Sequence, residues 1–190
     1  MKKQFLLIVC IGLICSSCAS LLSVANLVNC DFRMKSLSSA KLADVDVLQI
    51  NSISSLNFLD IGKLTRSYLN ENIPLDLQIN VEAKNPNSKT ASLSQFEWIL
   101  LIDDVEMTRG KHAKPVEIPG NGVTSIPMNI SFNLFELMKG ESKDALLNFA
   151  LNLADASNQP TRLSLRIKPT IYVNQVALTY PDYINVGTEF

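Results

Sequence analysis

One ten-residue segment constrains the fold more than any other part of the sequence. From Leu75 to Lys84 every odd position is apolar and every even position is polar. Because successive side chains of a strand point to opposite faces, this alternation predicts a strand with one face on a core and the other in water. Asn85-Pro86-Asn87 follows directly and predicts a structural turn. Proline fixes φ and lacks an N–H for the ladder, and asparagine side chains satisfy backbone groups that a turn leaves free.

Several other segments show the same alternation or a run of β-branched and aromatic residues. Pro169 lies on the inward-facing parity of the last segment, which predicts a sheet edge or a bulge there. Turn residues separate the segments at the spacing typical of a sandwich. The sequence therefore predicts a mainly β fold, an antiparallel β-sandwich of about seven strands. The six segments besides 75–84 are 31–35, 42–47, 93–102, 105–107, 126–132 and 162–173.

Two regions instead have apolar residues three and four positions apart. The first, near 56–70, predicts one amphipathic helix that ends before Pro74. The second, near 133–155, begins with Asn133 and Glu136 at capping-box spacing, is interrupted at Gly140 and resumes after Ser142. We expect these two or three helices to pack against the sheets.

The N-terminal residues have the pattern of a targeting segment. Lys2 and Lys3 precede an uncharged, mostly apolar run from Phe5 to Ile14, which is too short to span a bilayer. The small residues that follow lead into Cys18 and resemble the lipobox of bacterial lipoproteins. In that case residues 1–17 are a signal peptide, Cys18 is acylated and 18–30 form a tether. Cys15 as the acylated residue and an ordinary secretory signal remain the alternatives.

Charge and residue types exclude several classes of function. The chain has 17 basic and 18 acidic residues, so a nucleic-acid-binding face is not expected. After removal of the leader, Cys30 is the only unmodified cysteine, and we expect a small buried side chain there. No phosphate-binding glycine loop or G-x-S-x-G motif is present, the chain after the leader has no CxxC pair, and we expect neither a cofactor nor an enzyme.

Two groups of residues are candidates for reactive sites. Asp103, Asp104 and Glu106 could bind a hard cation, but two aspartates at a hairpin are also ordinary turn chemistry. We therefore predict no metal site. His112, the only histidine, lies in a basic segment that we interpret as an exposed loop. A hydrolase would require carboxylates or hydroxyls converging on His112.

The segment Leu77–Asn87 resembles the strand and Asn-Pro-Asn motif of the late-embryogenesis-abundant (LEA) group 2 family, whose domain is also called the WHy domain. The strand from Leu93 through Trp98, the Asp103-Asp104 turn, Gly110 and the Leu165-Ile167-Pro169 pattern fit the same motif. The resemblance covers roughly residues 31–175. It implies an immunoglobulin- or fibronectin-III-like sandwich over 31–190, and plant members of the family are associated with desiccation. The family has no agreed catalytic residues.

With the lipobox, the resemblance implies a bacterial lipoprotein of the cell envelope, held to the membrane by its N-terminal lipid. Ala19-Ser20-Leu21-Leu22 follows Cys18 without acidic residues, which favours the outer membrane facing the periplasm. We expect a non-catalytic binding or stress-protective module. The alternatives are a lipid-binding carrier, which needs an open apolar cavity, and an adaptor subunit, which needs a long unprotected edge strand. The protein or lipid ligand is not identified by the sequence.

Overall fold

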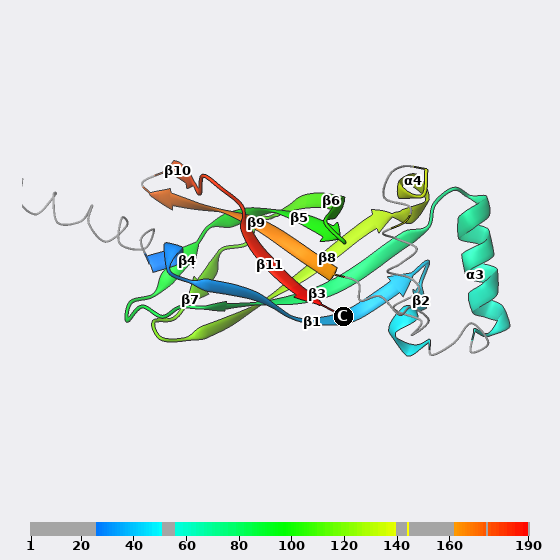
Figure 1. Ribbon diagram of the computed structural model, residues 1–190, viewed down its shortest axis with the longest axis horizontal. Helices are drawn as coiled ribbons and strands as arrows, with labels where there is room; N and C mark the ends of the chain where they lie inside the picture. Colours follow the sequence, from blue (N-terminus) through cyan, green and yellow to red (C-terminus); the bar gives the residue numbers. More distant parts are fainter. Residues whose placement is uncertain (1–25, 51–55, 140–143, 145–161, 174, 190) are drawn as a thin grey trace, which may run out of the picture.

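The computed structural model describes residues 26–50, 56–139, 144, 162–173 and 175–189 of the 190-residue chain. Two antiparallel sheets dominate it (Figure 1). The first has the strand order β2-β1-β3-β8. Its strands are β1 (Asp31–Leu42), β2 (Val45–Asp46), β3 (Pro74–Lys84) and β8 (Val123–Asn133).

The second sheet has the order β10-β9-β5-β6, and β11 pairs with β9. Because β5 occupies one side of β9, β10 and β11 share the other side, each along a different part of β9. A separate two-stranded sheet consists of β4 and β7. The bounds are β4 (Ala91–Leu93), β5 (Gln95–Ile102), β6 (Val105–His112), β7 (Val116–Ile118), β9 (Arg162–Val173), β10 (Val176–Thr179) and β11 (Ile184–Glu189).

The expected fold class is confirmed: the fold is mainly β, an antiparallel sandwich with few helices. Among the described residues there are eleven strands, of which seven have six or more residues. The alternation of β3 explains why it forms, since Leu75, Leu77, Ile79 and Val81 are all buried. The inward side chains of both sheets and of the β4–β7 pair share one core, and the largest of those that are fully buried are Phe96, Ile79, Leu93, Leu100, Ile102, Ile118, Ile130, Leu163, Leu165 and Ile167.

Two tight turns join neighbouring strands with two residues each. Ala43 and Asp44 link β1 to β2, and Asp103 and Asp104 link β5 to β6. All four have positive φ, between 48° and 64°. Two consecutive positive φ angles are the signature of a type I′ turn, whose twist matches that of the flanking strands.

Pro169 lies within β9, which has strands on both sides and is therefore not an edge strand. The pairing of β9 with β11 ends at Ile167, and its pairing with β10 begins at Thr170. Pro169 thus lies between the part of β9 that pairs with β11 and the part that pairs with β10. There its carbonyl accepts a hydrogen bond from the Tyr180 N–H at 2.8 Å.

Helices flank the end of the sandwich opposite the N-terminal segment (Figure 1). The helix predicted near 56–70 is α3 (Phe58–Leu69), capped by the Asn57 side chain. In the second predicted region, α4 (Leu134–Leu137) begins after the Asn133 cap. The remainder of that region, 140–155, lies outside the described residues apart from Asp144. A 3-10 helix, η1 (Val47–Gln49), follows β2.

Candidate functional site

The Asn-Pro-Asn segment forms a polar cluster at the end of the sandwich where the N-terminal segment enters. Asn85 is fully buried, and its side chain makes hydrogen bonds at every position available to an amide. Its Nδ2 donates to the carbonyls of Lys89 and Ile118, each at 2.9 Å. Its Oδ1 accepts from the Asn87 N–H at 3.0 Å and from Asn87 Nδ2 at 2.8 Å. One side chain therefore joins the end of β3 to the loop before β4 and to the end of β7.

Asn87 extends this cluster to the N-terminal segment. Its Nδ2 donates to the Asn26 carbonyl at 2.8 Å, and its Oδ1 accepts from Asn29 Nδ2 at 3.3 Å. Its own carbonyl accepts from the Asn121 N–H at 2.8 Å. We call these residues, Asn26, Asn29, Asn85, Asn87 and Asn121, the asparagine cluster. The cluster holds Asn26 and Asn29, near the start of the described chain, against the turn that follows β3.

Gly120 completes this end of the molecule by close backbone packing. A Cβ at Gly120 would lie 2.2 Å from the carbonyl oxygen of Ser88. Only glycine therefore lets the 119–122 turn approach the turn after Asn87. Sequence reasoning identified Asn85, Pro86 and Asn87 but missed Asn26, Asn29 and Gly120. Nothing in the local sequence signals their contacts, because these residues meet the motif only through the folded chain.

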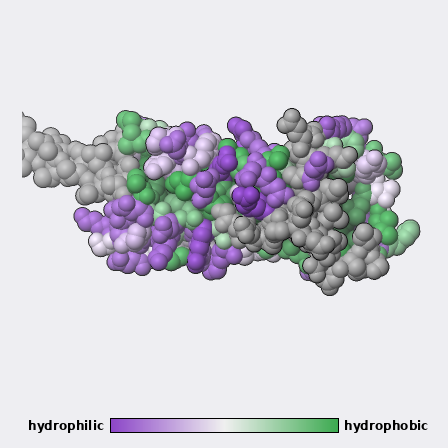
Figure 2. Space-filling view, in the orientation of Figure 1, coloured by the Kyte–Doolittle hydropathy of each residue, from purple (hydrophilic) through white to green (hydrophobic). Residues whose placement is uncertain are grey.

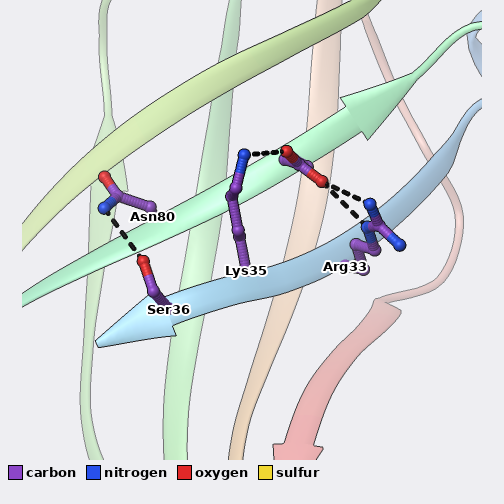
Figure 3. A network of polar contacts seen from close by, with 5 residues as sticks. Arg33, Lys35, Ser36 and Asn80 are labelled. Atoms are coloured by element: carbon purple, nitrogen blue, oxygen red, sulfur yellow. Dashed lines mark hydrogen bonds and ion pairs between the residues drawn. The ribbon is translucent and has the colours of Figure 1, made fainter. Parts of the chain in front are cut away.

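An ion-paired network lies beside the asparagine cluster on the outer face of the first sheet (Figure 3). Glu82 accepts hydrogen bonds from Lys35 and Arg33, and its side chain is only 9% exposed. These two donors lower the pKa of the Glu82 carboxyl, with the Lys35 hydrogen bond as the larger cause. The pairing of β1 with β3 shifts by one residue between Met34 and Ser36, which places Lys35 at a bulge where it reaches Glu82.

The alternation placed Glu82 in water, and this is wrong. Its carboxyl lies beneath the two longer basic side chains, which remain well exposed. In the same network Asn80 Nδ2 donates to Ser36 Oγ at 3.2 Å. A shallow hollow of about 410 Å³ adjoins the ion pairs and is lined by Asp31, Arg33, Glu82, Lys84 and Val123.

The acidic residues at 103–106 make structural contacts in and beside the hairpin of β5 and β6. Asp103 Oδ1 accepts a hydrogen bond from the Arg162 N–H at 2.8 Å, and Asp104 lies 3.3 Å from the Arg162 guanidinium. Glu106 is paired with Arg109 at 2.7 Å. Within the described ranges no group of three or more histidine, cysteine, aspartate or glutamate side chains is placed to hold a metal ion.

His112 is not in a loop, contrary to the expectation. It is the last residue of β6, and its ring stacks on Phe96 with 4.7 Å between centroids and 13° between planes. Burial is the larger cause of a lowered pKa of His112, and the nearby Lys114 adds to it. The basic segment 109–112 forms a strand because its residues pair with β5 from Phe96 to Ile99.

Cys30 is buried, as expected, and is a free thiol within the shared core. Burial raises the pKa of the thiol, and Asp31 raises it further. Its Sγ lies 3.3 Å from the Asn26 carbonyl, the same carbonyl that Asn87 contacts. Among the described residues no helix has the length and apolar character needed to cross a membrane.

Cys18 and Cys15 lie outside the described residues, so the fold does not distinguish the two candidates for acylation. The first described residues, Asn26 to Val28, are helical and lead into β1. Leu27 is buried and belongs to the core, whereas Val28 is 54% exposed. In the sequence, Asn26 is eight positions after Cys18.

Comparison with known proteins gives distant structural likenesses. No family profile and no curated protein sequence matches the chain. A solution structure described as a late embryogenesis abundant protein is 15% identical, with a TM-score of 0.44, over 88% of this chain and 73% of that one. A solution structure from Arabidopsis thaliana is 14% identical, with a TM-score of 0.41, over 84% and 76%. A crystal structure from Archaeoglobus fulgidus is 15% identical, with a TM-score of 0.37, over 62% and 84%.

Proposed function

We propose that the protein is a non-catalytic lipoprotein of the bacterial cell envelope, anchored by acylated Cys18, whose β-sandwich is a binding or stress-protective module of the LEA group 2 kind. In this proposal residues 1–17 are removed as a signal peptide. The tether that follows Cys18, residues 19–30, carries no acidic residue, and this supports the periplasmic face of the outer membrane.

The observation that carries the proposal is the link between the Asn-Pro-Asn motif and the tether. Asn87 holds the Asn26 carbonyl at 2.8 Å, and Asn85 holds Asn87 from the buried side. A buried polar side chain with every hydrogen bond made is costly to replace and specifies one arrangement of its neighbours. The motif that suggests the family therefore also holds Asn26, which lies in the proposed tether.

The contacts of the polar residues support a non-catalytic module. Asp103 and Asp104 are engaged with Arg162 in the turn region, and the His112 ring lies against Phe96. Asn85 is satisfied by backbone groups and Asn87. Each of these side chains makes structural contacts that explain its position without a substrate.

The interior supports a solid module over a lipid carrier. Side chains of both sheets fill the space between them, and Ile79, Ile130, Leu100 and Leu165 are each at most 2% exposed. The apolar hollow near the tether has a volume of about 260 Å³, and the two hollows of about 410 Å³, beside Glu82 and along α3, lie on the surface and not between the sheets. Pockets for small molecules usually have about 300–1,000 Å³ and enclose most of the ligand. The adaptor alternative has less support at the longest edge strand, β8, because β8 carries Pro127, a residue typical of edges that resist strand addition.

Metabolic labelling with a palmitate analogue tests the anchor. The full-length chain is expressed in a Gram-negative host, and label is measured on the purified protein. We expect the label to be lost in Cys18→Ser and retained in Cys15→Ser, the matched control three residues away. Loss of the label in Cys15→Ser alone, or no label on the unmodified chain, would overturn the proposal.

The protective role has a separate test. The purified protein is dried together with a labile reporter enzyme, and the activity recovered on rehydration is compared with that obtained with an equal mass of an unrelated β-sandwich. We expect the protein to preserve several-fold more activity. Equal recovery in the two samples would contradict stress protection and leave a binding module.

A further inference from the structure

Apolar side chains gather on the surface at the end where the tether enters the fold. All four residues of β10 are exposed, among them Val176 at 61% and Leu178 at 40%. Tyr172 on β9 and Val28 on the tether are each about half exposed. Figure 2 shows hydrophobic surface at this end, beside the grey N-terminal segment. We call Val28, Val176 and Leu178 the tether-end patch.

Val28 and Leu178 of the tether-end patch line a shallow apolar hollow. The hollow of about 260 Å³ lies between the tether residues Leu27 and Val28 and the strand pair β9–β10, with Pro181 and Ile184 at its rim. Contiguous exposed apolar surface on a folded protein marks a site of interaction. Because β10 is a short edge strand and all its side chains are exposed, its apolar residues stabilise the core little.

Several tyrosines, a residue type common at membrane interfaces, lie on or between the strands that carry the tether-end patch. Three of the four tyrosines of the chain, Tyr172, Tyr180 and Tyr183, lie on or between β9, β10 and β11. The Lys168 ammonium lies 5.6 Å from the centroid of the Tyr183 ring. Tyrosine is enriched at the headgroup level of bilayers, because its ring is apolar and its hydroxyl remains hydrated. Lysine also places its charge at this level while its stem contacts apolar surface.

The length of the tether limits how far this end can lie from the membrane. This step rests on the proposed acylation of Cys18. Eight residue steps separate Cys18 from Asn26, which span at most about 28 Å when fully extended. Residues 19–25 are uncharged, so nothing in the tether opposes a close approach to the bilayer. An anchor so short gives the patch a high effective concentration at the lipid surface.

We propose that the tether-end patch rests on the bilayer surface to which the lipid anchor is attached. Val176, Leu178 and Val28 enter the headgroup region, and the neighbouring tyrosines lie at its boundary with water. Contact of the patch and the anchor at one end directs the long axis of the sandwich away from the membrane. The α3 helix, at the opposite end, then faces the aqueous compartment (Figure 1).

Quenching by brominated lipids tests this contact on the full-length, processed chain. An environment-sensitive dye is attached to Val176→Cys or to Phe58→Cys, and the protein is reconstituted into vesicles of phosphatidylethanolamine and phosphatidylglycerol. Phe58 on α3 is the control, because it is 87% exposed at the other end. Cys30 is buried with a raised thiol pKa, so the dye reacts at the introduced cysteine. The unsubstituted chain measures any background labelling.

We expect brominated lipids to quench the dye at position 176 several-fold more strongly than the dye at position 58. Equal, weak quenching at both positions, with the protein still bound to the vesicles, would overturn the contact and leave the anchor intact. A dye at 176 that is shielded from water but not quenched would show a protein occupant and also overturn it. Protein that does not remain with the vesicles would overturn the anchor itself.

Discussion

The two ends of the sandwich are built in opposite ways. At the end where β1 begins, which we call the tether end after the proposed tether, Asn85 is fully buried with four hydrogen bonds, and Gly120 packs against the backbone of Ser88. At the other end, α3 has no buried residue, and Phe58 and Leu59 are both strongly exposed. Burial and complete hydrogen bonding raise the local stability of a region against unfolding. We therefore expect substitutions at the tether end to cost far more stability than substitutions in α3.

Asparagine side chains join distant segments at both ends of the sandwich, but they differ in burial. Asn133, at the α3 end, likewise joins distant segments, since its Oδ1 accepts from the N–H groups of Ile73 and Phe135. Its bonds cap the short helix α4 and hold the approach to β3. Asn85 is fully buried, whereas Asn133 is only partly buried. Water can replace the partners of a partly buried group, but not those of a buried one.

The largest effect is expected for Asn85→Ala. The substitution leaves the buried Ile118 carbonyl without its donor, and it removes the part-buried bonds to the Lys89 carbonyl and from Asn87. A buried polar group left unsatisfied costs about 1–3 kcal/mol and the part-buried groups add to this, so we expect a loss of at least about 2 kcal/mol. Urea denaturation measures this loss. The control is Asn129→Ala, an exposed position on β8, which should change stability by less than about 0.5 kcal/mol. Equal effects at the two positions would contradict the account.

Gly120→Ala and Gly62→Ala should have opposite signs. A Cβ at Gly120 meets the Ser88 carbonyl oxygen at 2.2 Å, so we expect a loss of about 1–3 kcal/mol. A Cβ at Gly62 on α3 meets nothing within 4 Å, and alanine is favoured over glycine in a helix by about 1 kcal/mol. Thermal unfolding of both variants measures the pair. A destabilised Gly62→Ala protein would show that something covers this face of α3.

Acidification should reveal the Glu82 network. The pKa of Glu82 is lowered in the folded state, so its ion pairs contribute stability above the ordinary glutamate pKa of about 4.3. That contribution is lost as the pH falls through the lowered pKa, because the folded state must then bind a proton that the unfolded state already holds. Glu82→Gln removes the contribution at neutral pH and should flatten the dependence of stability on pH below about 4.3.

The double variant Arg33→Gln, Lys35→Gln is the matched test, because it keeps the carboxyl and removes the two cations paired with it. It should likewise weaken the dependence of the free energy of unfolding on pH below about 4.3, as measured by urea denaturation across a series of pH values. If the pH dependence of stability in this range is unchanged in both variants, it arises from other groups.

The smallest effect is expected for Leu59→Ser in α3. The side chain is 73% exposed and no residue of the helix is buried, so the substitution removes little packing. We expect a change within about 0.5 kcal/mol, apart from a small loss of helix propensity. A loss above about 2 kcal/mol in urea denaturation would contradict the contrast between the two ends.

The sequence predicts the regular strands well because alternation is a local property. The alternation of 75–84 predicted β3 within one residue at its start, and 126–132 lies inside β8. The alternation did not reveal β10 and β11. Val176-Ala177-Leu178 has consecutive apolar residues that are all exposed, so no period of two marks an inner face.

The contacts that define the tether end are not readable from local sequence. Asn85 and Ile118 are 33 residues apart, and Asn87 and Asn26 are 61 apart. Glu82 occupies a polar position of an alternating strand, yet a bulge at Lys35 on the neighbouring strand brings a second donor over it. His112 follows glycine and lysine, as loop residues do, and forms a strand only because β5 offers it a partner. Each of these outcomes depends on a second segment that the local pattern does not identify.

Native mass spectrometry of the full-length chain, purified from host membranes in detergent, tests the central claim most directly. The account predicts a chain that begins at Cys18, carries covalently bound acyl groups and holds no further lipid, because the sandwich interior is filled by side chains. Lipid extraction of the same sample should leave the covalent mass unchanged. A chain without covalent lipid would contradict the anchor, and a stoichiometric non-covalent lipid would contradict the solid module and establish a carrier.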